Sequence, residues 1–484
     1  MLSHLPPLPI IIDYDGREPL SAKDEEGVLL ALQKHDRIRR IHLCASTGTT
    51  LDKLFAVMNG SLPLLDNLGL CIEPSNADEN ESVSNELELP RLPQSFQAPH
   101  LDHLDLSGVG NLTEVGLPLL ATLFNLVSLT LAMTPASRYL SLNYLTLCLS
   151  LMPQLKHLDL VFEFCVLSDD IARKPINNPP NVRQIPLSNL TGFFFHGDSS
   201  YLEALAARIT VPHITTFNAT FLDEPSSTLP HLSGLLTTAA GLRFPTALIK
   251  FSSPRLRDPM VTIWMANSEQ TLGHQQLFPP FRIGFPSSSL YAQVTSAGKM
   301  CTALTPMLSE VGILHLYFNE TRSWSLHDRP IDNARWYALL RPFCEVKKLH
   351  VDGQLWGLSR ALSPDDSGPS MEILPELRKI LRWDGARFSG AFDGFIAARR
   401  DAGQHIVKRW RTLYSDGEGR EGEDGRQEDN EGSFTLGFAD ERGEDEESSS
   451  STYTGSDLDF GTDHEPGILT EIDSDSDSDS ESMR

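Results

Sequence analysis

The chain has 484 residues and a formal net charge of -25, and this charge is unevenly distributed. Residues 415–484 hold 24 acidic side chains and four arginines, a net charge of -20, so the preceding residues carry only -5. Because phosphate binding needs concentrated positive charge, this composition excludes nucleic acid as the main partner. No apolar run reaches the roughly 18 residues that a membrane-spanning helix needs, so we expect no membrane partner either.

Strand and helix patterns alternate from the N-terminus onward. The apolar stretch PIIIDY (9–14) predicts a strand, and the following residues from Glu25 to His35 have the apolar spacing of a helix. The stretch IRRIHL (38–43) predicts a second strand, and apolar residues at helical spacing between Leu51 and Met58 predict a second helix. Two strand-and-helix units therefore occupy the first 60 residues.

The pattern L-x-x-L-x-L is the main repeat of the chain. Its three clearest copies are LDHLDL (101–106), LVSLTL (126–131) and LKHLDL (155–160). Related copies are IRRIHL (38–43), LDNLGL (65–70), LTGFFF (190–195), ITTFNA (214–219), VGILHL (311–316) and VKKLHV (346–351). Apolar residues alternate with polar ones within each copy, as in a strand with one buried face. A strand and a helix that repeat in this way predict a solenoid.

The spacing of the copies predicts an irregular solenoid. The first seven copies start 24 to 36 residues apart, whereas leucine-rich repeats are typically about 20–29 residues long. The Asn or Cys expected three positions after the last leucine is also missing from the first five copies, where Ser46, Glu73, Val109, Thr134 and Glu163 stand. We therefore predict an α/β fold, an irregular leucine-rich-repeat-like solenoid or horseshoe over residues 1–414, with a parallel sheet on its concave face and helices outside.

Two segments interrupt the regular pattern. Residues 72–99 are polar and rich in proline, which predicts a surface loop between repeats. The repeats are less regular over residues 222–310, where VTIWM (261–265), FRIGF (281–285) and LYAQV (290–294) predict strands whose order is left open.

The remaining elements are predicted from apolar spacing and charge. Further helices are predicted at 113–124, 139–152, 201–209, 300–310 and 333–340, and a basic helix near 388–414 would cap the end of the solenoid. The acidic, serine-rich residues 415–484 cannot bury a core, so we expect a disordered tail. This tail either keeps the protein in solution or is a target of acid-directed kinases.

The six cysteines indicate a reducing compartment. They lie at 44, 71, 148, 165, 301 and 344, mostly within apolar runs and without a C-x-x-C spacing, so they are interpreted as reduced thiols. The first residues lack the basic segment and unbroken apolar run of a signal peptide. We therefore expect a cytoplasmic or nuclear protein.

Several stretches resemble one known family. They are PLPIIIDYDGRE, DEEGVLLALQKHDRIRRIHL, LPQSFQAPHLDHLDL, LMPQLKHLDLVF, YLEALAARITVPHI, RPFCEVKKLHVDG, and ILPELRKI followed by FDGFIAARRDAG. Together they resemble, in the same order, the leucine-rich-repeat region of F-box proteins of mushroom-forming fungi. The resemblance implies target selection for ubiquitination. Met1 falls where the linker of that family enters the repeats, so we expect a Skp-type adaptor as partner only if an F-box is present upstream.

No pattern in the sequence predicts catalysis. Nucleophile-elbow, P-loop, metalloprotease and dinucleotide-binding motifs are all missing. The spacing His100-x-x-His103 with Asp105, and the related pair His157 and Asp159, offers imidazole and carboxylate groups that could bind zinc or relay protons. If Leu104 and Leu106 point inward, however, His103 and Asp105 are ordinary outward strand positions. We therefore assign no catalytic, cofactor or metal residue.

The outward strand positions are the candidate site for a protein partner. Adjacent parallel strands align them about 4.8 Å apart. The central column of outward positions is His42, Gly69, Asp105, Thr130, Asp159, Phe194, Asn218, His315 and His350. The candidate residues that flank this column are Arg40, His103, His157, His196, Tyr317 and Lys348. A polar face with aromatic residues suits protein recognition, although an ordinary hydrated strand face has the same composition.

Three functions are therefore compared. The first is a non-catalytic protein-recognition module like the target-binding repeats of an F-box protein, whose target is unknown. The second is a free-standing scaffold or decoy that acts without the ubiquitin machinery. The third is an enzyme, which only the histidine and aspartate positions favour.

Overall fold

The computed structural model describes a series of ranges between residues 8 and 411. They are 8–16, 22–45, 48–72, 96–108, 124–133, 140–162, 184–225, 229–239, 241–252, 259–267, 279–318, 331–352, 356–362, 373–383 and 392–411. These ranges all belong to one compact unit, Met1–Phe438. Most of the loop predicted at 72–99, most of the helix predicted at 113–124 and the whole tail predicted at 415–484 lie outside the described residues.

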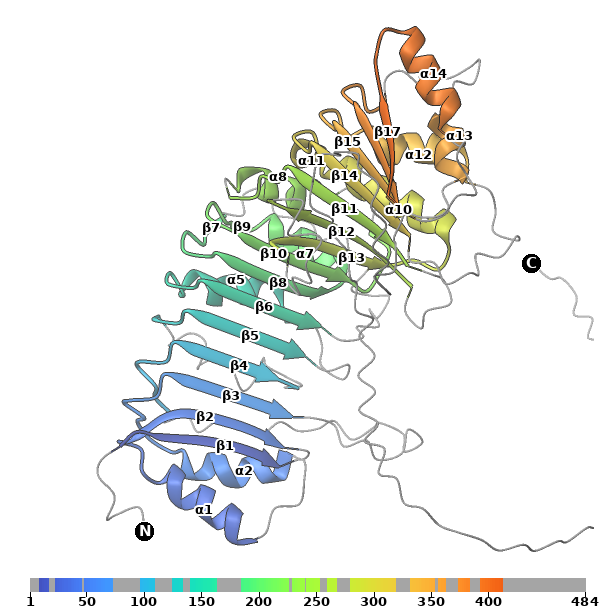
Figure 1. Cartoon of the computed structure of the whole chain (residues 1–484). Helices are drawn as coiled ribbons and strands as arrows, with labels where there is room; N and C mark the ends of the chain where they lie inside the picture. The colour runs from blue at the N-terminus through green and yellow to red at the C-terminus, as the bar shows by residue number, and fades with distance from the viewer. Residues whose placement is uncertain are drawn as a thin grey trace, which may run out of the picture. The chain divides into compact units, whose positions relative to one another are not determined.

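A single long sheet runs through the described ranges (Figure 1), with the strand order β1-β2-β3-β4-β5-β6-β8-β10-β13-β12-β11-β14-β15-β16-β17. Its strands are β1 (Ile10–Gly16), β2 (Ile38–Ala45), β3 (Asn67–Ile72), β4 (His103–Ser107), β5 (Ser128–Met133), β6 (His157–Phe162), β8 (Gly192–Gly197), β10 (Thr216–Phe221), β11 (Thr246–Phe251), β12 (Met260–Ala266), β13 (Phe281–Pro286), β14 (Ile313–Phe318), β15 (Lys348–Asp352), β16 (Lys379–Trp383) and β17 (Val407–Arg411). Only β12 is antiparallel to its neighbours among these strands.

The helices lie on one side of the sheet. They are α1 (Ala22–Leu32), α2 (Gly48–Val57), α5 (Leu142–Ser150), α7 (Ser199–Ala206), α8 (Pro230–Thr238), α10 (Leu290–Ala303), α11 (Thr305–Leu308), α12 (Asn333–Leu340), α13 (Trp356–Leu362) and α14 (Asp393–Asp401). Each of them contributes buried side chains to the same hydrophobic core as the inward residues of the strands. The opposite side of the sheet, where none of the described helices lies, is called the open face below. The predicted α/β fold, with a mostly parallel sheet and helices on one side, is confirmed.

The strands follow the period of two that their sequences predict. Leu104 and Leu106 of β4, like Leu129 and Leu131 of β5, are buried, and the residues between them are more exposed. From β8 onward phenylalanine often replaces leucine on the inward side. Phe193 contacts Phe217 with ring centroids 5.8 Å apart, and Phe217 stacks on Phe281 at 5.6 Å. Larger rings fill a core layer that leucines fill in the earlier repeats.

The repeats enter their strands through the same backbone hydrogen bonds. The Asp66 carbonyl accepts from the N–H groups of Asp102 and His103, and the Asp102 carbonyl accepts from Val127 and Ser128 in the next repeat. The same bonding continues to the Thr191 carbonyl and recurs farther along the chain at the carbonyls of Pro245, Gly312 and Lys347. This ladder of shared carbonyls fixes the register of neighbouring strands, so that equivalent residues stand in line across the sheet.

The middle of the sheet departs from the order of the chain. After β10 the chain continues to β11, and β12 and β13 then return to fill the gap between β11 and β10. The helix α10 crosses back from β13 to β14. Its 14 residues give it a length of about 21 Å, enough to pass two strands that are about 4.8 Å apart. The sequence does not predict β11. This strand does not pair with β10, so β12 and β13 fit between the two.

Two sequence predictions fail in this region and at the C-terminal end. LYAQV (290–294), predicted as a strand, begins α10, because Ser289 caps the helix by accepting from the Ala292 N–H at 3.2 Å and apolar residues follow at helical spacing. The helix predicted over 388–414 ends at Asp401, where Gly403 has a positive φ of 82°. The chain then adds β17 to the sheet rather than a terminal helix.

A second, small sheet lies outside the long one. It pairs β7 (Ile185–Pro186) with β9 (Ile209–Thr210) in parallel. Residues 201–209 were predicted as a helix, but α7 ends at Ala206 and Ile209 starts β9 instead.

Candidate functional site

The predicted central column forms one continuous line across the open face. In strand order it comprises Asp13, His42, Gly69, Asp105, Thr130, Asp159, Phe194, Asn218, Arg282, Trp264, Leu248, His315, His350 and Leu381, each paired in register with the next. Every residue predicted for this column is in it. Arg282, Trp264 and Leu248 were missed, because they belong to the inserted strands β13, β12 and β11, and Asp13 of β1 and Leu381 of β16 were missed as well.

The predicted flanking residues fall on two sides of this column. Arg40, His103, His157 and Lys348 lie two residues before the central position of their strands, whereas His196 and Tyr317 lie two residues after it. Lys250 is in register with Tyr317 and was also missed. No apolar–polar alternation marks β11, where TALIK is buried except for its lysine, so the sequence offered no signal for Lys250.

Two of the predicted contact residues are inaccessible. His315 and His350 point to the open face but are only 7% and 4% exposed, and their rings stack with centroids 4.0 Å apart. Burial lowers the pKa of His315 to about 4, with the charge of Lys348 as a smaller cause. This histidine is therefore neutral at pH 7 and supports the face without presenting a charge.

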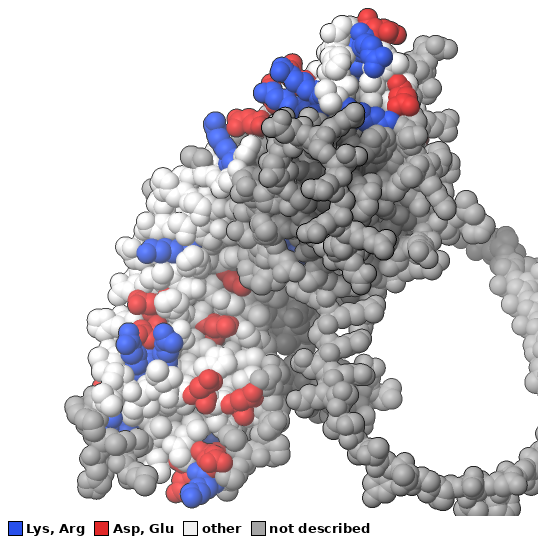
Figure 2. Space-filling view, in the orientation of Figure 1, with Lys and Arg blue, Asp and Glu red and all other residues white. Residues whose placement is uncertain are grey.

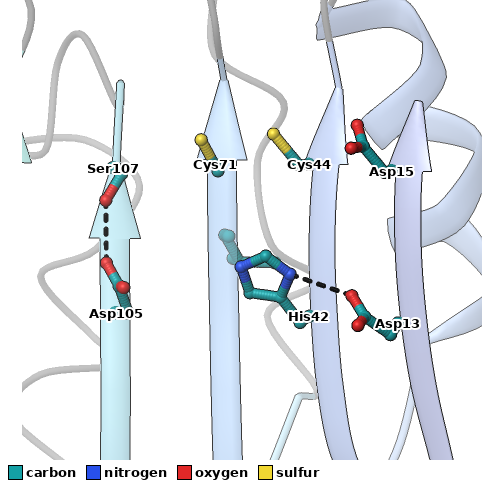
Figure 3. A pocket seen from close by; sticks show the side chains of 8 residues that line it. Asp13, Asp15, His42, Cys44, Cys71, Asp105 and Ser107 are labelled. Atoms are coloured by element: carbon teal, nitrogen blue, oxygen red, sulfur yellow. Dashed lines mark hydrogen bonds and ion pairs between the residues drawn. The ribbon is translucent and has the colours of Figure 1, made fainter. Parts of the chain in front are cut away.

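A hollow of about 590 Å³ opens on the face near the first strands (Figure 3). Its lining residues are Asp13, Asp15, His42, Cys44, Leu70, Cys71, Asp105 and Ser107. His42 Nδ1 lies 3.2 Å from an Asp13 carboxylate oxygen, and Ser107 Oγ donates to Asp105 at 2.8 Å. The hollow thus places polar groups of β1, β2 and β4 around one space, with Leu70 and Cys71 of β3 between them.

A glycine makes room for the histidine beside this hollow. A Cβ atom at Gly69 would lie 2.5 Å from Cδ2 of His42, so the imidazole ring occupies the space of the missing side chain. The same arrangement recurs at Gly192, where a Cβ would lie 2.8 Å from Nδ1 of His157. In both repeats the strand after the histidine carries a glycine, which lets the ring lie over the neighbouring strand.

One carboxyl group of the column has a shifted pKa. Burial raises the pKa of Asp159 to about 6, and the negative charge of Asp105, two strands away, raises it further. A carboxyl that titrates near neutrality is a familiar feature of catalytic sites, but ion-pair networks and acidic faces show it as well. Asp159 has Thr130 and Phe194 as its neighbours in the column, which supply neither a nucleophile–base pair nor a metal ligand.

Within the described ranges, no group of three or more His, Cys, Asp or Glu side chains could hold a metal ion. The histidines at 100, 103 and 157, which suggested zinc or proton transfer, are exposed strand or turn residues. The helices of the described ranges are all too short or too polar to cross a membrane.

The repeated strand-and-helix units, their mostly parallel sheet and the main core that they share define an α/β leucine-rich-repeat-like fold. No protein-family model and no curated protein matches the chain. Among solved structures, the leucine-rich repeat-containing protein LegL7 from Legionella pneumophila is 12% identical, and the match covers 82% of this chain and 99% of that chain with a TM-score of 0.26. A score this low carries no argument, so the assignment stands on the architecture itself.

Proposed function

We propose that this protein is a non-catalytic recognition module that binds another protein through the open face of its sheet. The observation that carries the proposal is the unbroken central column, in which one residue from each strand of the long sheet between β1 and β16 stands in register with the next. Leucine-rich-repeat-like folds are generally protein-binding modules, because stacked repeats create an extended surface on a rigid frame. Functional residues on such a frame keep fixed positions without any cost of ordering a loop.

The chemistry of the column supports a protein ligand. Phe194 lies between Asp159 and Asn218 in the column, and Tyr317, beside the column, is in register with Lys250. Both aromatic side chains are half-buried. Aromatic side chains of this kind often supply most of the binding energy of a protein interface, whereas their polar surroundings supply specificity.

The test is an alanine scan after affinity capture of a partner. Phe194→Ala and Tyr317→Ala should each weaken binding by about 1–4 kcal/mol. The matched control is Leu147→Ala, which truncates a 58% exposed apolar side chain on helix α5 and should leave the affinity unchanged. If the affinity depends on Leu147 and not on the two aromatic residues, the proposal is wrong.

Target selection for ubiquitination is the more specific form of this proposal. It is supported by the sequence resemblance to the repeat region of fungal F-box proteins, in which such repeats choose the substrate. The alternative is a scaffold or decoy that binds its target without the ubiquitin machinery.

A Skp-type adaptor distinguishes the two forms. The purified chain is mixed with the adaptor, alone and after addition of an F-box fused in front of Met1. Adaptor capture by the fused form, with target ubiquitination that requires Phe194, supports the ligase role. Target binding without any effect of the F-box on target turnover in cells supports the scaffold.

A further inference from the structure

Two cysteines lie side by side on the open face. Cys44 of β2 and Cys71 of β3 are direct neighbours in register. Their Cα atoms are therefore about 4.8 Å apart, and their side chains leave the sheet on the same side. Figure 3 shows the two thiols at the same level of the adjacent strands, in the hollow that both residues line. Both are reduced thiols.

This arrangement suits a disulfide bond between the two residues. The Cα atoms of disulfide-linked cysteines are usually about 4.4–6.8 Å apart, and their side chains point toward a common space. The register of β2 and β3 meets the first condition, and the shared hollow meets the second. Rotation about the two Cα–Cβ bonds is therefore the main movement that a disulfide needs here.

The other described cysteines are placed differently. Cys148 and Cys301 are buried on the helices α5 and α10, where burial raises the pKa of both thiols and so keeps them unreactive. Cys344 is exposed in the turn before β15. Among the cysteines that the structure describes, strand pairing brings only Cys44 and Cys71 together.

The surroundings of the pair favour an uncharged oxidant. Cys44 is 4% exposed, whereas Cys71 is half-buried and is reached through the hollow. Asp13 and Asp105 line the same hollow, and Figure 2 shows acidic side chains over the first strands. Negative neighbours disfavour the thiolate and repel an anionic oxidant such as glutathione disulfide. Hydrogen peroxide is small and neutral, so it enters the hollow more easily and meets Cys71 first.

We propose that Cys44 and Cys71 form a redox-controlled staple, in which hydrogen peroxide joins β2 to β3 through a disulfide bond. In the first step the Cys71 thiolate attacks one peroxide oxygen, the O–O bond breaks, and a sulfenic acid and hydroxide form. In the second step the Cys44 thiolate attacks the Cys71 sulfur, the S–O bond breaks, and a second hydroxide leaves. The two thiol protons convert both hydroxides to water, and the two electrons that the thiols lose reduce the peroxide.

The staple stabilises the first strands of the described sheet. β1 pairs with β2 alone among the described strands, and repeats with neighbours on one side only open more readily than those in the middle. The disulfide closes the chain segment between residues 44 and 71, which includes α2. A closed loop leaves the unfolded segment fewer conformations, so oxidation makes these repeats open less often.

The bond is a signal rather than a permanent part of the fold. In the reducing compartment that the cysteine pattern indicates, disulfides are transient and return to thiols when the oxidant is gone. The stability of the first repeats therefore follows the level of peroxide. This device is separate from the partner that the open face binds.

The test treats the reduced full chain with hydrogen peroxide, blocks the remaining thiols with N-ethylmaleimide in denaturant, and maps the peptides by mass spectrometry without reductant. The number of blocked cysteines should fall by two from the six in the sequence. A linked pair of peptides that contain Cys44 and Cys71 should appear, lighter by two hydrogen atoms than the reduced pair, and should disappear with dithiothreitol. Hydrogen exchange of β2, α2 and β3 should slow about 10-fold or more on oxidation, and that of β14 to β16 should not change.

Three variants assign the roles of the thiols. Cys71→Ser should abolish the link. Cys44→Ser should leave a sulfenic acid at Cys71 that dimedone traps, because the thiol that completes the disulfide is missing. Cys344→Ser is the matched control, since it removes a more exposed thiol from another part of the chain, and it should leave the link unchanged. Thermal melting of each reduced variant verifies that the fold is kept.

Each outcome decides for or against the proposal. A reversible link between Cys44 and Cys71 within one chain, together with slower exchange of the first strands, supports it. Oxidation of Cys71 to sulfinic or sulfonic acid without a link overturns it, because the two thiols then do not meet. A link from Cys71 to a second chain, or a link that Cys344→Ser abolishes, also overturns it. An intramolecular link that leaves hydrogen exchange unchanged overturns the stabilising role.

Discussion

At the scale of single residues, the direction of each strand side chain decides whether a polar group is tolerated. Leu129 and Thr130 are adjacent in β5, but Leu129 is 1% exposed in the core whereas Thr130 faces the open side. Leu129→Asp should lower the free energy of unfolding by several kcal/mol, because an unpaired charge is buried. Thr130→Asp should cost less than about 1 kcal/mol. Urea denaturation of both variants measures the difference, and equal losses would contradict the assigned direction of the strand.

The shifted pKa of Asp159 makes stability depend on pH. In the folded state this carboxyl titrates near 6, above its usual value of 3.8, so the folded protein binds the proton more tightly than the unfolded chain. Asp159 therefore lowers stability above pH 6, and this penalty disappears as the pH falls to 3.8. Asp159→Asn should raise the free energy of unfolding at pH 7.5 by about 1 kcal/mol, a value reduced for partial solvent exposure.

The neutral His315 makes stability depend on pH in the opposite direction. Its folded pKa near 4 lies below the usual 6.5, so its contribution to stability is complete above pH 6.5 and is lost as the pH falls toward 4. Measurement of Asp159→Asn across pH 4–8 therefore separates the two groups. The gain over the original protein should shrink as the pH falls, and a gain that is constant with pH would show that the pKa of Asp159 is not raised.

At the scale of elements, the inserted strands depend on one buried glutamine. Gln293 of α10 is fully buried, and its Nε2 donates to the carbonyls of Ser252 and Ser287 at 2.8 and 3.1 Å. These residues follow β11 and β13, so the side chain ties both ends of the insertion to the helix that crosses it. Gln293→Leu should cost about 2–4 kcal/mol, because two buried carbonyls lose their donor.

A surface position on the same helix provides the control. Lys299→Leu removes a partly exposed side chain that lies 3.5 Å from Glu224, and exposed ion pairs contribute at most about 1 kcal/mol. Chemical denaturation of both variants tests the comparison. A loss for Gln293→Leu no greater than that for Lys299→Leu would show that the glutamine does not hold the insertion.

The sequence predicts the regular elements because the pattern that defines each one lies within a few consecutive residues. In LDHLDL and LKHLDL, alternating leucines define both the strand and its buried face. The shared register of neighbouring strands then brings His42, Asp105 and Asp159 into one column. β11 lacks this alternation, since five of its six residues are buried, and a short apolar run such as LYAQV fits a strand or a helix equally well. The order of β11, β12 and β13 depends on contacts between distant segments. The column residues on these strands, Leu248, Trp264 and Arg282, were therefore not predictable.

At the scale of the whole molecule, the strand order makes most contacts local. From β1 to β8 each strand pairs only with the strand before it and the strand after it in the sheet. In such an array a local defect destabilises its neighbours first, and its effect decreases with distance along the sheet. The insertion of β11, β12 and β13 is different, because α10 connects β13 to β14 across it.

This difference predicts how far along the sheet a destabilising substitution lowers local stability. Leu68→Asp, which buries a charge in β3 where Leu68 is 0% exposed, should abolish hydrogen-exchange protection from β1 to about β5 and leave β14 to β16 protected. The matched change Ile263→Asp, in the antiparallel strand β12 at 0% exposure, should reduce protection in β10, β11, β13 and β14 together, because the crossing helix joins both sides of the insertion. Hydrogen exchange followed by mass spectrometry measures both patterns. Uniform loss of protection along the whole sheet in Leu68→Asp would contradict the local model, since it would require all repeats to unfold as one cooperative unit.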